Sequence, residues 1–349
     1  MFKKLAARSH SRKRSLGLTL VELMVALAIS TVIVIAAVSA LIVSRQGFTT
    51  VDAASQLRDN ARFATDLVQR LGIQAGHTSI DFAASTRTSN DQTNPPPSVF
   101  GFNNAKYEGE SPQLYSPTTR SNSNEVGFGS DILVLGFQTS ARFSGSSDSD
   151  ESMINCFGNA TSALPIDRDA RFYNILSVGI SSGEPALMCR TGINISTGAT
   201  SSTSTVTLTA TVTQPLVTGV ENFQVLYGVD GVVANTLVTA TPTFVATNYL
   251  RADQFAVPDD PDSIKTNTNW RRVRSIRIGM VIRGPLGSAQ ETLAQTHYPF
   301  GRAAGASGGA AGSALSSTAD PGTVFTPAAD SRLRQVVTFT LHLRNDQGL

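Results

Sequence analysis

One carboxylate interrupts an apolar stretch near the start of this 349-residue chain. Residues 18–43, LTLVELMVALAISTVIVIAAVSALIV, contain Glu22 as their only charged side chain. As a helix, this stretch is long enough to cross a hydrocarbon core of ~30 Å. A carboxylate in such a segment is costly unless it finds a partner. Glu22 is therefore a candidate functional residue, and the alternative is a carboxylate that reaches the lipid headgroups.

The two cysteines could form a disulfide. Cys156 and Cys189 make no C-x-x-C motif and have no histidine pair nearby, so a zinc or thioredoxin-type site has little support. In an oxidising compartment they would close a loop and stabilise the fold by about 3–4 kcal/mol. The alternative is two free thiols in a reduced cytosolic protein.

The sequence predicts no catalytic, cofactor-binding or metal-binding residue, and therefore a protein that is not an enzyme. It contains no G-x-S-x-G, H-E-x-x-H or phosphate-loop motif. His77, His297 and His342 lie far apart and lack other ligands at metal-binding spacing. The acidic runs at 147–151 and 259–262 do not have the EF-hand pattern and are interpreted as solvated loops.

Charge gives no support to direct nucleic-acid binding. Residues 1–17 hold six of the 28 lysines and arginines and no acid. The remaining 22 cations face 26 acids, so the basic character of the chain belongs to its first residues.

The elements that would position these residues are one long helix followed by strands. Apolar residues recur at spacings of three and four in 51–77, which predicts a buried face made of Leu57, Ala61, Ala64, Val68, Leu71 and Ala75. We expect a helix over 19–75, with Gly76 as its C-cap. Strands are predicted at 131–138, 172–180, 186–190, 204–213, 220–229, 273–283 and 333–343. Trp270 is interpreted as a packing residue rather than a ligand platform. A helix followed by antiparallel strands indicates an α+β fold.

The rest of the chain is expected to be loops. Residues 78–130 are rich in Ser, Thr, Asn, Pro and Gly and predict a long connection with little regular structure. Residues 301–323 have low complexity and predict a flexible segment.

Three interpretations of the N-terminal segment are open from its composition. It could be an ordinary signal peptide cut after Ala40, a plain membrane anchor, or a retained helix behind a cleaved leader. The pattern resembles the class III signal of type IV prepilins: a short basic leader, Gly17, an apolar helix from Leu18, and a glutamate as its fifth residue. The resemblance implies cleavage between Gly17 and Leu18 and N-methylation of Leu18. It also implies that Glu22 meets the N-terminal amine of a neighbouring subunit.

The later segments resemble the PilW family of minor pilins. They are LRDNARFATDLVQRLGIQAGH at 57–77, SDILVLGF at 130–137, GVENFQVLYGVD at 219–230, WRRVRSIRIGMVIR at 270–283 and RLRQVVTFTLHLRN at 332–345. Gly72 and His77 depart from the usual cation and aromatic, and the inserts near 84–128 and 301–323 are expected to be specific to this lineage.

The resemblance implies a pilin-like α+β fold in three parts. Residues 1–17 are the cleaved leader, and 18–77 are the pilin helix, transmembrane over 18–43 and amphipathic over 51–77. Residues 78–349 form a β-rich head, periplasmic or extracellular, that packs on the helix.

The implied function is a minor pilin that helps to initiate pilus assembly and sits at or near the fibre tip. Its partners would be prepilin peptidase, the inner-membrane assembly platform and other pilins. The chain would lie in the bacterial inner membrane first and in the pilus at the cell surface afterwards. Two alternatives are a minor pseudopilin of type II secretion and a membrane-anchored periplasmic adhesin or enzyme.

Overall fold

The computed structural model describes residues 17, 19–83, 97–109, 114–194, 208–302 and 320–345. The chain divides into two compact units, Met1–Val51 and Asp52–Leu349. Helix α1, Leu20–Gln74, begins in the first unit and ends in the second. The expected helix over 19–75 is therefore confirmed to within one residue at each end.

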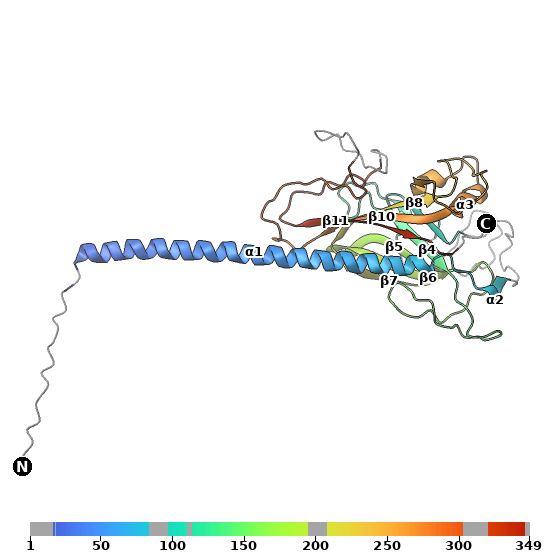
Figure 1. Cartoon of the computed structure of the whole chain (residues 1–349), viewed down its shortest axis with the longest axis horizontal. Coiled ribbons are helices and arrows are strands. Elements are labelled where there is room, and N and C mark those ends of the chain that lie inside the picture. The colour runs from blue at the N-terminus through green and yellow to red at the C-terminus, as the bar shows by residue number, and fades with distance from the viewer. Residues whose placement is uncertain are drawn as a thin grey trace, which may run out of the picture. The chain divides into compact units, whose positions relative to one another are not determined.

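The second unit is built on two antiparallel sheets (Figure 1). The larger has the order β1-β4-β5-β6-β7, with bounds Val99–Phe102, Ile132–Phe137, Phe172–Ser181, Glu184–Asn194 and Leu208–Thr218. The smaller has the order β11-β10-β8-β9, with bounds Arg334–His342, Val273–Arg283, Val220–Val229 and Asn248–Leu250. The remaining elements are a two-stranded ladder of β2 and β3 and three short helices, with bounds Ala105–Lys106, Thr118–Thr119, α2 Ile80–Ala83, η1 Ala252–Phe255 and α3 Ile264–Trp270.

The second half of α1 packs through the face that its periodicity predicts. All six expected residues are buried, and Ala53 joins them. The six expected residues belong to one hydrophobic cluster with residues of β4, β5, β8 and β10. Gly72 lies against β11, where an added Cβ would stand 2.7 Å from the Leu341 side chain. A side chain at this helical position would therefore require the Leu341 side chain to move, which is consistent with the glycine there.

Gly76 ends the helix as expected. Its φ of 80° is left-handed, a conformation that glycine adopts at little cost. Its N–H donates to the carbonyl oxygen of Gly136 at 2.8 Å, so the end of the helix is bonded to β4.

All seven predicted strands are present, and the pairing of β10 with β8 shifts register between Val273 and Ser275. The prediction of little regular structure in 78–130 missed four short elements, α2, β1, β2 and β3. β1 is only four residues long and forms by pairing with β4, a long-range contact that a short VFGF run does not indicate. Residues 84–96 and 303–319, within the two expected inserts, lie outside the described residues.

Trp270 is a packing residue, as interpreted. Its ring stacks on Phe255 with centroids 3.7 Å apart and meets Tyr227 edge-on at 4.9 Å. Only 6% of its surface is exposed. This aromatic cluster fixes α3 and η1 against β8.

A disulfide anchors the long connection between β4 and β5. It joins Cys156 in that connection to Cys189 in β6, with Cα atoms 6.4 Å apart and both residues buried. Close by, the Ile154 N–H donates to the Gln74 side chain at 2.7 Å. The bridged connection therefore also holds the C-terminal end of α1.

A closed ring of six alternating charges joins the two sheets. We call it the charge ring, and its members in order are Glu184, Arg283, Glu221, Arg334, Asp330 and Arg332. Arg283 contacts Glu184 at 2.6 Å and Glu221 at 2.9 Å. Arg334 contacts Glu221 at 2.6 Å and Asp330 at 2.7 Å. Arg332 closes the ring, with nitrogen–oxygen distances of 3.7 Å to Asp330 and 3.2 Å to Glu184. Glu184 belongs to the larger sheet and the other residues to the smaller sheet or its connections. Every charge has two opposite neighbours, which offsets the cost of removing these groups from water.

Removing the disulfide should destabilise the head. We expect the Cys156→Ser/Cys189→Ser double variant to lose ~3 kcal/mol in the free energy of unfolding, because its unfolded chain gains loop freedom. Denaturant titration of the full chain measures this loss. A thiol reagent applied to denatured protein should label no cysteine without reductant and both with it. Labelling without reductant would contradict the bridge.

The charge ring should contribute to stability through Glu221, whose side chain is 9% exposed. We expect Glu221→Gln to lower the free energy of unfolding by ~2 kcal/mol, because two arginines lose an anionic partner. Glu291→Gln is the matched control, since Glu291 is exposed and outside the ring. Equal stability of the two variants would show that the ring contributes nothing.

The charge ring should also make stability depend on acid. Hydrogen bonds from Arg283 lower the pKa of Glu184, and those from Arg334 lower the pKa of Asp330. Carboxylates with lowered pKa values stabilise the fold above the ordinary values of 4.5 and 3.8, and this contribution is lost as pH falls through the lowered ones. Unfolding titrations between about pH 6 and pH 3 should therefore show a shallower fall for Glu184→Gln than for the wild type, because that variant lacks one carboxylate whose pKa is lowered by folding.

Candidate functional site

The first turn of α1 contains Glu22, the acidic residue that the sequence singles out. Thr19 precedes the helix, and its N–H and hydroxyl both donate to Glu22 Oε2, at 2.9 and 3.1 Å. In return the Glu22 N–H donates to the Thr19 hydroxyl at 3.2 Å. This reciprocal pair is a capping box, which satisfies N–H groups that the first helical turn leaves free.

Sequence reasoning missed Thr19, although the T-x-x-E spacing ahead of an apolar run was a readable signal. The geometry leaves part of Glu22 unused. Both donors meet Oε2, and Oε1 accepts no hydrogen bond from the described residues. One carboxylate can therefore cap its own helix and present its other oxygen to a cation from elsewhere.

The predicted processing site lies immediately before the cap. Gly17 is exposed, and an added Cβ there would meet nothing within 4 Å. Leu18 and the basic residues before Gly17 lie outside the described residues. The structure thus places Gly17 ahead of the helix and outside any regular element, and does not test cleavage.

The first unit is an apolar helix that buries none of its described side chains. Every described residue from Leu20 to Thr49 is exposed. The helix is long and apolar enough over its first part to cross a membrane, by length and composition. Ser30, Thr31 and Ser39 donate their hydroxyls to carbonyls of the preceding turn, at 2.7 to 2.8 Å. Their polar groups are therefore paired within the helix, as an apolar surrounding requires.

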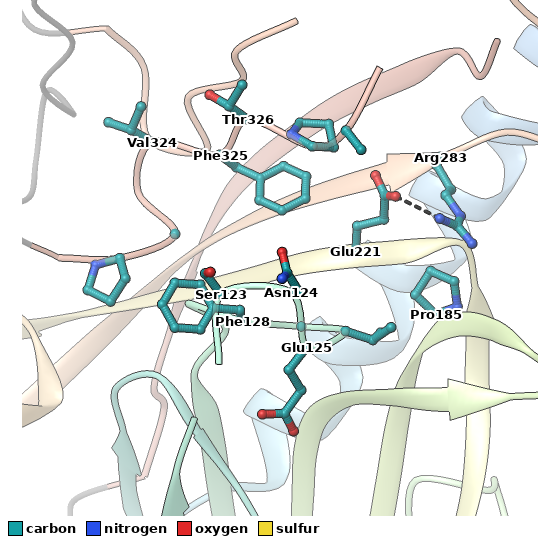
Figure 2. A pocket seen from close by; sticks show the side chains of 16 residues that line it. Ser123, Asn124, Glu125, Phe128, Pro185, Glu221, Arg283, Val324, Phe325 and Thr326 are labelled. Carbon is teal, nitrogen blue, oxygen red and sulfur yellow. Dashed lines mark hydrogen bonds and ion pairs between the residues drawn. The ribbon is translucent and has the colours of Figure 1, made fainter. Parts of the chain in front are cut away.

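A hollow of about 670 Å³ opens beside the charge ring (Figure 2). Phe128 and Phe325 line it, together with the Glu221–Arg283 pair and Glu125. Its charged groups already have partners, because Glu125 also pairs with Lys106 at 2.5 Å. Both carboxylates that line the hollow, Glu221 and Glu125, are therefore engaged in ion pairs.

The histidines lie on separate parts of the fold, and His77 is near Asp150 of the acidic run at 147–151. His77 approaches Ser140 at 3.3 Å and His297 pairs its backbone with Phe325, and burial lowers the pKa of both imidazoles. His342 is exposed at the end of β11. In the run at 259–262, Asp260 accepts the N–H groups of Lys265 and Thr266 at the start of α3. Among the described residues no three His, Cys, Asp or Glu side chains are arranged to hold a metal ion.

Two family models match this chain. A family model described as Type IV Pilus-assembly protein W matches residues 173–345, and the prokaryotic N-terminal methylation motif matches residues 12–38. A solved type IV-like pilin from Thermus thermophilus covers 84% of this chain and 97% of its own, at 10% identity and a TM-score of 0.34. None of the curated proteins matches the chain. The methylation motif spans the Gly17–Glu22 region and the PilW match runs from β5 to the end of β11, so the chain belongs to the PilW family of type IV pilin-like proteins.

Proposed function

We propose that this minor pilin helps to initiate type IV pilus assembly and is incorporated at or near the fibre tip. Prepilin peptidase cleaves between Gly17 and Leu18 and methylates Leu18. The helix then waits in the inner membrane, with the head in the periplasm, until the assembly platform moves it into the fibre. There its neighbours are other minor pilins and the major pilin. No chemical step is assigned to the chain itself.

The observation that carries this proposal is the Thr19–Glu22 capping box at the start of an apolar helix. Cleavage creates an ammonium group at Leu18, and a neighbouring subunit would offer the same group. Glu22 Oε1 is available for such a cation while Oε2 holds Thr19. In an apolar surrounding an ion pair of this kind is strongly position-dependent, because an unpaired charge there is costly. Glu22 would thereby set the axial position of one subunit against the next.

The mature N-terminus tests the processing step. Mass spectrometry of the chain isolated from its own cells should find N-methylated Leu18 as the first residue. Retention of Met1, or cleavage after Ala40, would contradict the proposal. Gly17→Leu should retain the leader, and the same measurement reports it.

Glu22 and Thr19 can be separated by matched variants. Glu22→Ala should be cleaved normally yet lose at least about tenfold in surface pili counted by electron microscopy, because the register-setting charge is gone. Thr19→Val should reduce assembly less than Glu22→Ala does, because it removes only the hydroxyl that helps to orient Glu22. Thr19→Ser keeps a hydroxyl at this position and should assemble normally. Normal piliation with Glu22→Ala would contradict the assigned role.

A chromosomal deletion distinguishes the pilus from a secretion system. Loss of surface pili with normal export of secreted enzymes supports the proposal. The reverse result would assign the chain to type II secretion.

A further inference from the structure

Three of the four margins of the five-stranded and four-stranded sheets carry features that prevent pairing with another strand. β1 and β9 are only four and three residues long. β7 is longer, but Pro215 lies within it opposite Met188, and its pairing with β6 contains two register shifts. Short strands, proline and irregular register are the features by which natural proteins protect sheet edges.

β11 has none of these features. It pairs with β10 over nine residues without a register shift, from Ser275↔His342 to Arg283↔Arg334. Residues 335–341, QVVTFTL, include no charge, proline or glycine and are rich in β-branched side chains. All its residues except Leu341 keep part of their surface exposed.

The free backbone groups of β11 can be assigned from the hydrogen bonds at its two ends. Gly284 N–H donates to Leu333 O at 2.8 Å, and Leu343 N–H donates to Arg274 O at 2.9 Å. In an antiparallel pair these bonds alternate, so odd-numbered residues face β10 and even-numbered residues face outward. The N–H and C=O groups of Val336, Thr338, Thr340 and His342 therefore point away from the sheet. None has a backbone partner in the described part of the chain.

We propose that β11 receives a β-strand from a neighbouring pilin subunit, which extends the four-stranded sheet. This proposal rests on the function proposed above, because that function places other subunits beside this head. Main-chain hydrogen bonds supply the affinity in this mode of binding, and side chains on alternate positions supply the specificity.

The side chains along β11 define the partner strand. Val337 and Phe339 present partly exposed apolar surface on one face. On the other face Thr340 presents its hydroxyl, and the Thr338 hydroxyl donates to the Pro299 carbonyl oxygen at 2.5 Å. Arg334 is already paired within the charge ring. At the other end Arg344 is exposed and has no ion pair among the described residues. The matching strand is therefore uncharged and alternating over about five residues, with a carboxylate at the end facing Arg344.

Hydrogen exchange on the wild-type chain tests the register directly. The full chain is purified in detergent, alone and with each of the other minor pilins of its own cell. Alone, the amides of Val336, Thr338 and Thr340 should exchange fast while those of Val337 and Phe339 are protected. With the correct partner the even-numbered amides should become protected. Protection that appears in the isolated chain and rises with its concentration would make the occupant a second copy and overturn the proposal.

Matched variants test whether the edge carries binding. Proline at residue 340 removes only an outward N–H, so Thr340→Pro should weaken the partner complex at least about tenfold, whereas Thr340→Val keeps that N–H and should bind normally. Arg344→Glu should also weaken binding of the partner. This second variant introduces no proline, so its result does not depend on how β11 tolerates one. Unchanged binding by both Thr340→Pro and Arg344→Glu would overturn the proposal.

Failure here is distinguishable from failure of the proposed function. If Thr340→Pro cells keep normal pili while Glu22→Ala cells lose them, the chain is an assembly pilin whose β11 edge is not its docking strand. If neither variant affects pili, the function itself is contradicted.

Discussion

The head depends on one packing constraint, the contact of the buried face of α1 with both sheets. Five residues of the helix, together with Ala75 just after it, lie in a single hydrophobic cluster with the strands. Gly72 permits the close approach to Leu341, and Gly76 then ends the helix and bonds it to β4. Because protein interiors are close-packed, a larger side chain along this face would displace a strand rather than fill a void.

Local patterns were enough to predict the elements of this fold. The spacing of Leu57, Ala64 and Leu71 predicted the buried face, and the strand predicted at 273–283 has the bounds of β10. Such patterns carry no information on which strands become neighbours. The division into two sheets and the existence of β1 follow from long-range pairing, so they could not be read from the sequence.

The candidate site was predictable in part for the same reason. Glu22 stood out because a charge in an apolar run is rare, and two cysteines have only one way to pair. Thr19 was readable from its spacing to Glu22 but was missed. The charge ring was not readable at all, because Glu184 and Arg334 are 150 residues apart. Only the folded sheets bring their oppositely charged ends together.

The disulfide and the Gln74 contact have a consequence for the order of events. Cys156 and Cys189 can join only in an oxidising compartment, and their bridge holds the connection that bonds to the last turn of α1. On the proposed route to the periplasm, the end of the helix is thus secured after export and not before. Immediately after translocation, the contact between the end of α1 and the head would not yet be held by the disulfide. Oxidation would then fix this contact, so that a force applied to the helix is transmitted to a fully folded head.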